Sequence, residues 1–178
     1  MNADNITTGT LDASMVVFPD GSELTTAGIV TTPASSSGTV TVGYTYDSTT
    51  SEYVYNPPAV IPGLEWTMDS AGASNAYNIQ AVIYYGMSGT ANSTPLELFL
   101  VVDGNVSSPQ SVLSVPVAAL SNAGGTAVYF GTVSGLSAGS HTIQLAASLP
   151  GTLVDGEPTS SSAVVGVTGS YALCQRVF

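Results

Sequence analysis

Hydrophobic and polar residues alternate along most of this chain, and a period of two is the pattern of β-strands. The alternation is clear in TVTVGYTY (residues 39–46) and YNIQAVIYY (residues 77–85), and it returns near the end in YALCQRVF. Gly, Pro, Asn and Asp separate the alternating runs and indicate turns. Helical periodicity is almost absent, since only residues 117–121 could form a helical turn. The sequence therefore predicts an all-β fold.

The number and spacing of the strands narrow the fold class. Roughly eight strands with at least two long crossings favour an antiparallel β-sandwich of the jelly-roll type over a meander, although the strand order does not follow from the pattern. A chain of 178 residues can form one such domain and a short extension. The segment before Gly38 has few aromatic residues and ends in TTPASSSG, which is a linker composition. We therefore expect an N-terminal segment of residues 1–37 and a sandwich head of residues 38–178.

The N-terminal segment contains a hairpin signal. In FPDGSELTTAG, the residues Pro19, Asp20 and Gly21 stand between an apolar run and a polar run, and Asp-Gly at such a place is a strong turn signal. A two-stranded hairpin alone is only marginally stable in water. It must therefore pack against the rest of this chain or against another copy of it, and the pattern leaves both alternatives open.

The charge balance excludes several classes of partner. Twelve acidic residues face one basic residue, Arg176, and the formal net charge is −11. Nucleic-acid binding is excluded because the chain cannot build the basic patch that phosphates require. The same sign disfavours anionic membranes, and no apolar run reaches the ~20 residues of a transmembrane helix. The N-terminus has no signal-peptide pattern, so we expect synthesis in a cytoplasm followed by lysis or assembly into a particle.

Two phrases near the N-terminus carry a family resemblance. NADNITTGTLDAS (residues 2–14) resembles the A-x-N-I-T-x-G-T-L/I-x-A phrases of tail-fibre and tail-tip proteins of tailed bacteriophages. VFPDGSELTTAG (residues 17–28) resembles the F-P-D-G-T-x-Q-T-T-A phrase of phage fibres and departs from it at Glu23 and Leu24. The two phrases lie back to back, and the resemblance covers only this part of the chain.

The resemblance implies an intertwined trimeric stem or collar, in which the hairpin packs against two other copies. It also implies a virion protein whose partners are other tail or baseplate proteins and a host surface glycan or protein. The apolar residues of the segment agree with a trimer, since they are too few for a core in one chain and a threefold axis would bury them by repetition. These expected assembly residues are Ile6, Leu11, Val16, Phe18 and Leu24. The alternative is that residues 1–37 add an edge hairpin to the sandwich.

Catalytic and metal-binding patterns are weak in this sequence, and we predict no enzymatic activity, no cofactor and no metal. His141 is the single histidine and alternates in phase with apolar neighbours, so we expect it in a core or a protomer interface rather than in a catalytic triad. Carboxylates that could serve a glycosidase, Glu65 and the loop pair Asp155 and Glu157, are expected to be solvated. Cys174 lies in an alternating run and is expected to be a buried small hydrophobe.

The remaining candidates are aromatic. The stretch YTYDSTTSEYVY places tyrosines of one parity on either side of a polar turn with two carboxylates, and stacking on tyrosine beside hydrogen-bond acceptors suits sugar binding. The candidate receptor-binding residues are Tyr44, Tyr46, Asp47, Glu52, Tyr53 and Tyr55. If the shared face of the tyrosines points inward, they are core residues instead, as we expect for Trp66 between Leu64 and Met68.

The sequence therefore predicts a non-enzymatic phage virion protein, a short tail fibre or fibre head that binds a host receptor through several copies at once. The alternative from a different class is a purely structural capsid decoration or collar protein. A third reading is a free carbohydrate-binding module.

Overall fold

The structure, a computed structural model, describes the chain in parts. The residues described with their side chains lie within 32–70, 72, 75–87, 95–115, 124–151 and 162–177, and for 15–17, 23–25, 31, 88, 153–154 and 157–158 the backbone alone is described. The chain divides into two units, Met1–Val30 and Thr31–Phe178. Each unit is treated by itself below.

The division between the units falls earlier than the boundary that we placed near Gly38. Strand β3 (Thr31–Ser35) lies within the stretch that has the composition of a linker, and it pairs antiparallel with β15 (Tyr171–Val177). Because β3 is an edge strand, it needs hydrogen-bond donors on one side only, and an edge strand can accommodate Pro33. The sandwich therefore begins at β3.

The described part of the first unit is a β-hairpin. Strands β1 (Met15–Val17) and β2 (Glu23–Thr25) pair antiparallel, with Val16 opposite Leu24. This pairing confirms the predicted hairpin, while its packing against other copies stays a prediction. Three expected assembly residues lie outside the described residues: Ile6, Leu11 and Phe18.

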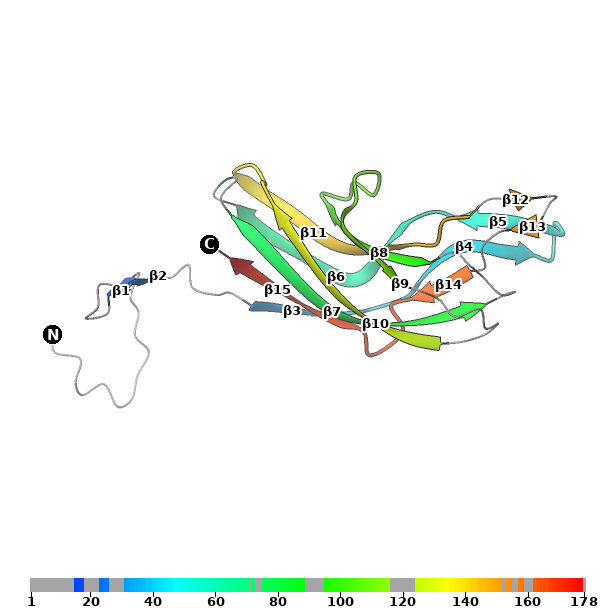
Figure 1. Ribbon diagram of the computed structural model, residues 1–178, viewed down its shortest axis with the longest axis horizontal. Coiled ribbons are helices and arrows are strands. Elements are labelled where there is room, and N and C mark those ends of the chain that lie inside the picture. Colours follow the sequence, from blue (N-terminus) through cyan, green and yellow to red (C-terminus); the bar gives the residue numbers. More distant parts are fainter. Residues whose placement is uncertain are drawn as a thin grey trace. The chain divides into compact units, whose positions relative to one another are not determined.

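The second unit contains two antiparallel sheets (Figure 1). The first sheet runs β3-β15-β7-β14-β4-β5, with β10 paired to β7; its further strands are β4 (Val40–Asp47), β5 (Glu52–Asn56), β7 (Ala76–Ser88), β10 (Gly124–Ser134) and β14 (Ser162–Val165). The second sheet runs β6-β11-β8-β9, from β6 (Ala59–Ser70), β11 (Gly139–Ser148), β8 (Leu96–Val102) and β9 (Gln110–Val115). A separate two-stranded ladder joins β12 (Leu153–Val154) to β13 (Glu157–Pro158).

The strand order is that of a jelly roll. Strand β7 pairs with β10 along one side, and its other side is shared between β15 and β14. We number the strands of the sandwich 1 to 8 in chain order, count β3 and β4 as one interrupted first strand and β14 and β15 as one interrupted last strand, and leave out β5, β12 and β13. The two sheets then have the strand orders 1-8-3-6 and 2-7-4-5. This arrangement confirms the predicted antiparallel β-sandwich of jelly-roll type. The described residues contain no helix long and apolar enough to span a membrane, and the helical turn predicted at 117–121 lies outside them.

The core between the sheets is built from the apolar positions of the alternating runs. Its largest fully buried side chains include Tyr77, Tyr129, Ile61, Leu64, Ile79 and Ile83. Trp66 is buried as predicted, and its indole N–H donates a 2.9 Å hydrogen bond to the carbonyl of Thr32, which ties the second sheet to β3. Cys174 is also buried as predicted, and burial raises the pKa of its thiol to about 12.

The two sheets are joined where β9 approaches β10. The buried hydroxyl of Tyr129 donates a 2.6 Å hydrogen bond to the carbonyl of Ser111, and burial raises the pKa of Tyr129 above its usual range. The Ser111 hydroxyl donates to the carbonyl of Thr132 at 2.8 Å and accepts from its N–H at 3.0 Å. Ser111 has a φ of 51°, a left-handed conformation that points its side chain across the gap between the sheets. These bonds close one edge of the sandwich.

Candidate binding site

The predicted receptor-binding residues lie together on the hairpin of β4 and β5, which we call the aromatic ribbon (residues 44–55). Strand β14 pairs with β4 only as far as Gly43, so among the described residues the ribbon consists of two strands. The directly opposed pairs along the ribbon are Tyr44 with Tyr55, Tyr46 with Tyr53, and Asp47 with Glu52. The six residues thus come from two neighbouring strands and the turn between them.

The four tyrosines form two ring pairs on one face of the ribbon. The ring centroids of Tyr44 and Tyr55 are 5.0 Å apart with a tilt of 46°, and those of Tyr46 and Tyr53 are 5.2 Å apart in an edge-to-face arrangement. Tyr46 is 57% exposed and Tyr55 is 39% exposed, while the other two are half-buried. The question that the sequence left open is thereby answered, because these rings line a solvated surface rather than the core.

The turn of the ribbon carries the two carboxylates. Asp47 and Glu52 are opposed across the strands, one rung beyond Tyr46 and Tyr53, and by strand alternation their side chains lie on the face opposite the rings. The Asp47 carboxylate accepts a 2.8 Å hydrogen bond from the N–H of Thr49, and this bond is the main reason why the pKa of Asp47 lies below its usual range. The turn is therefore negatively charged at neutral pH and offers acceptors for hydroxyl groups. Among the described residues, no group of histidine, cysteine and acidic side chains could hold a metal ion.

The opposite face of the ribbon is polar and tied down by an asparagine. The side-chain amide of Asn56 donates to the carbonyl of Gly43 at 3.0 Å and to the hydroxyl of Thr45 at 3.1 Å. Val54 is exposed on this second face. The ribbon therefore has one aromatic face and one face without aromatic residues, which supplies a natural comparison for mutagenesis.

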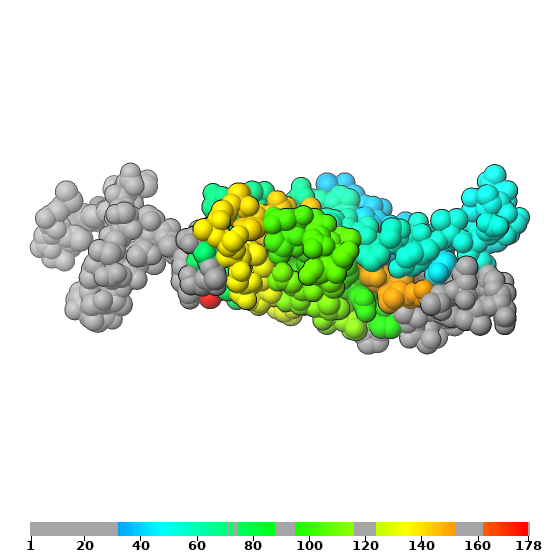
Figure 2. Space-filling model, turned by 90° about the horizontal axis from the view of Figure 1, so that it is seen from above, coloured from blue at the N-terminus to red at the C-terminus, as the bar shows by residue number. Residues whose placement is uncertain are grey.

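The ribbon lies at one end of the second unit. Strand β3 begins that unit and pairs with β15, which ends close to it, and both lie at the end opposite the ribbon (Figure 1). The space-filling view shows the ribbon, coloured cyan, projecting from the sandwich (Figure 2). The tyrosines are thus presented at the end of the unit that is remote from the point where the chain enters it.

His141 forms a second polar cluster that sequence reasoning missed. Its Nδ1 lies 2.9 Å from a carboxylate oxygen of Asp103, and its Nε2 lies 3.2 Å from both the hydroxyl and the carbonyl oxygen of Ser137. The other oxygen of Asp103 accepts a 2.9 Å bond from the N–H of Thr142. This cluster, the His141 clasp, joins the loop before β11 to the turn after β8. No local pattern links Asp103 to His141, so only the fold reveals it.

In the His141 clasp an acid, a histidine and a serine are hydrogen-bonded in the order found in a serine hydrolase, namely Asp103, His141 and Ser137. The same contacts also suit a purely structural role. A protonated ring can donate from Nδ1 to Asp103 and from Nε2 to the carbonyl of Ser137, so both nitrogens are paired without a substrate. The hydrogen bond to Asp103 raises the pKa of His141, and bonds from Thr142 and then from His141 lower the pKa of Asp103. Both shifts favour the charged pair, and we interpret the clasp as a loop tether.

Comparison with known proteins gives distant likenesses only. No family model matches the chain, and no curated protein matches it. Among solved structures, the chain is similar to "Structure of infectious bursal disease virus Gx strain" (12% identity, TM-score 0.41, 84% of this chain and 31% of that chain). It is similar to the Gt strain of the same virus (9%, 0.42, 96% and 42%) and to its "VP2 subviral particle" (10%, 0.39, 85% and 38%). The chain spans less than half the length of these chains, and the likeness is too distant to bear on function.

Proposed function

We propose that this chain is a non-enzymatic virion protein of the tail-fibre kind, whose sandwich presents the aromatic ribbon to a glycan on a host cell surface. The observation that carries the proposal is the ribbon itself, with four tyrosines on one exposed face beside a turn with two carboxylates. The virion part of the proposal is supported by the two fibre-like phrases in residues 2–28. Trimer formation by residues 1–37 belongs to the same proposal.

The chemistry of the ribbon suits an uncharged sugar chain. The C–H faces of sugar rings stack on tyrosine, and a sugar chain that reaches past the rings to the tip of the ribbon can donate from its hydroxyls to Asp47 or Glu52 there. Because the chain has a net charge of −11 and two of its carboxylates lie at the turn of the ribbon, anionic glycans would be repelled. Each ribbon is a small surface, so useful affinity comes from several copies that engage one cell together.

The experiment is a binding measurement with the full chain against immobilised neutral oligosaccharides of hexoses and N-acetylhexosamines, with acidic oligosaccharides for comparison. We expect Tyr46→Ala and Tyr55→Ala each to weaken binding by about tenfold or more, as exposed aromatic anchors do. Val54→Ala, on the opposite face of β5, is the matched control and should bind as the unchanged protein does. The fluorescence of the single tryptophan, Trp66, checks that each variant is folded.

The outcomes separate the proposal from its alternative. A purely structural decoration or collar protein would bind none of the oligosaccharides, and the tyrosine substitutions would then change nothing. Binding that falls equally with Val54→Ala would place recognition elsewhere than on the aromatic face. Either result would overturn the assignment of the ribbon.

A further inference from the structure

Four strands of the seven-stranded sheet, β3, β15, β7 and β10, carry no charged side chain at their described outward positions. On β15, β7 and β10, one parity of each strand is buried in the core and the other parity points outward. We call the outward positions of these strands and of β3 the uncharged face: Pro33, Ser35, Asn78, Gln80, Val82, Tyr84, Thr126, Val128, Phe130, Thr132, Ser134, Tyr171, Leu173, Gln175 and Val177. Arg176 has the inward parity of Ala172 and Cys174 and does not belong to it.

The charges of the described sandwich lie elsewhere. The exposed acids Glu65 and Asp69 belong to β6, Glu97 belongs to β8 and Asp103 follows it, all in or beside the four-stranded sheet. The other two, Asp47 and Glu52, lie at the turn of the aromatic ribbon. In a chain with a net charge of −11, the outward positions of β3, β15, β7 and β10 are therefore free of carboxylates, while the opposite sheet and the turn between β4 and β5 carry them.

The uncharged face is also apolar at its centre. In the register of the strands, Val128, Val82 and Tyr171 form one row across the sheet, and Phe130 and Leu173 flank Gln80 in the next. Phe130 is 66% exposed, Val128 is 54% exposed and Tyr171 is 50% exposed. Soluble monomers rarely expose a contiguous apolar surface of this kind unless it binds something.

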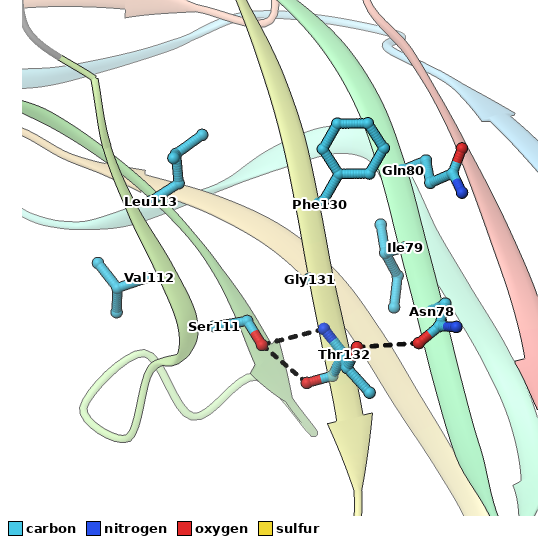
Figure 3. A pocket seen from close by; sticks show the side chains of 9 residues that line it. All are labelled: Asn78, Ile79, Gln80, Ser111, Val112, Leu113, Phe130, Gly131 and Thr132. Atoms are coloured by element: carbon cyan, nitrogen blue, oxygen red, sulfur yellow. Dashed lines mark hydrogen bonds between the residues drawn. The ribbon is translucent and has the colours of Figure 1, made fainter.

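A depression lies beside the most exposed of these side chains. It has a volume of about 460 Å³ and is lined by residues of β7, β9 and β10 (Figure 3). Phe130 and the exposed Val112 belong to its lining, together with Gly131. The face thus offers both a projecting aromatic ring and a recess next to it, which is the relief that a self-complementary interface needs.

We propose that the uncharged face is the surface through which two copies of this chain pack against each other. A partner that offered a carboxylate-bearing sheet would have to bury unpaired charges, which is strongly unfavourable. A second copy that offers the same face has none to bury, and a twofold arrangement places Phe130 of each copy at the recess of the other. The proposal rests on this face alone and does not depend on sugar binding by the ribbon.

Electrostatics and the contact area both support a second copy of this chain as the partner of the uncharged face. Two chains of net charge −11 repel, but packed sheets are ~10 Å apart, so the acids of the four-stranded sheet would lie about one Debye length or more behind the contact. With ~3.4 Å per residue and ~4.8 Å between strands, the paired parts of β3, β15, β7 and β10 cover roughly 550 Å² before side-chain relief is counted. Protruding side chains raise the accessible area above this flat estimate, toward the ~800 Å² that each partner contributes to a standard interface.

The first test measures the mass of the full chain by sedimentation velocity over a range of concentrations. Phe130→Glu and Val128→Glu place carboxylates opposite each other across the twofold contact, and we expect each to raise the dissociation constant of head pairing at least tenfold. The matched control is Thr67→Glu, which adds the same charge at an exposed position of the opposite sheet. Added salt should tighten the pairing of the unchanged chain, because it screens the repulsion between copies.

The second test reports on the face itself, since residues 1–37 could also hold copies together. Val128→Cys should be linked to a second chain by a short bismaleimide at least fivefold faster than Thr67→Cys, and Phe130→Glu should abolish that difference. The native Cys174 is buried, and crosslinking of the unchanged chain through it gives the background rate. Equal rates at the two positions, or a mass and crosslinking rate unchanged by both glutamate variants, would overturn the proposal. A chain that is monomeric and not crosslinked would also overturn the proposal.

Discussion

Gly131 is the position where one methyl group should do most damage to the edge of the sandwich. It follows Tyr129 on the same side of β10, and the tyrosine ring lies over it. A Cβ at residue 131 would lie 2.6 Å from Cζ and 2.7 Å from Cε1 of Tyr129, closer than the 3.0 Å below which something must shift. The ring cannot easily move, because it is fully buried and its hydroxyl is bonded to the carbonyl of Ser111 at 2.6 Å.

The cost of Gly131→Ala follows from these contacts. Overpacking a core by one methyl group costs about 1–3 kcal/mol, and losing the bond from Tyr129 to Ser111 costs about 0.5–1.5 kcal/mol. The φ of Gly131 is not positive, so alanine also gains about 0.4–1 kcal/mol through the smaller entropy of the unfolded chain. We expect a net loss of about 2 kcal/mol in the free energy of unfolding, which lowers the melting temperature of a domain of this size by about 4–8 °C.

Thermal unfolding followed by the fluorescence of buried Trp66 measures the change. The matched control is Gly86→Ala on β7, where an added Cβ meets no atom within 4 Å and the φ is not positive, so its melting temperature should stay the same or rise. In a Tyr129→Leu background the ring is gone, and adding Gly131→Ala should cost under about 0.5 kcal/mol. Equal effects of the two glycine substitutions, or a full cost in the leucine background, would refute the reasoning.

Two further predictions concern titratable groups. The raised pKa of His141 stabilises the folded state fully below the unfolded pKa of 6.5, and this stabilisation is lost as the pH rises through the folded pKa. The lowered pKa of Asp103 stabilises the folded state above its unfolded pKa of 3.8, and this stabilisation is lost as the pH falls below that value. The melting temperature of His141→Gln should therefore fall furthest below that of the unchanged chain between about pH 4 and pH 6.5 and approach it at higher pH; a constant gap would contradict the clasp. Cys174 should resist an aromatic disulfide reagent at pH 8 until the protein is unfolded, and rapid reaction of the native protein would disprove its burial.

The period-two pattern was sufficient to predict the fold class but not to locate the first strand of the sandwich. Alternation predicted the all-β sandwich, and the jelly-roll order agrees with it. The stretch TTPASSSG was misjudged because its composition is that of a linker, whereas an edge strand paired only with β15 tolerates proline and short polar side chains. The composition of a segment indicates only its own conformational preference. Strand β3 forms because it pairs with β15, which comes more than a hundred residues later.

The candidate site was predictable in its residues and not in its orientation. Equal parity placed the tyrosines of each strand on one face, and the register confirms that Tyr44 lies opposite Tyr55. Whether that face is buried depends on where the neighbouring strands stop, and among the described residues the pairing of β14 with β4 ends at Gly43. The same limit applies to the His141 clasp, because the fold brings Asp103 to His141 across a distance that no periodicity spans.

The distribution of charge connects the two proposals. A strongly acidic chain can assemble only through surfaces that bring no carboxylates together, and the uncharged face is such a surface while the ribbon turn is not. In the described part of the chain, the ribbon extends beyond the last residue of β4 that β14 pairs with, whereas the uncharged face is built on β3, β15, β7 and β10. Packing through that face would therefore leave the tyrosines exposed. Each head pair would then present two weak sugar-binding strips in a fixed relation, which raises the affinity for a surface that bears many copies of one glycan.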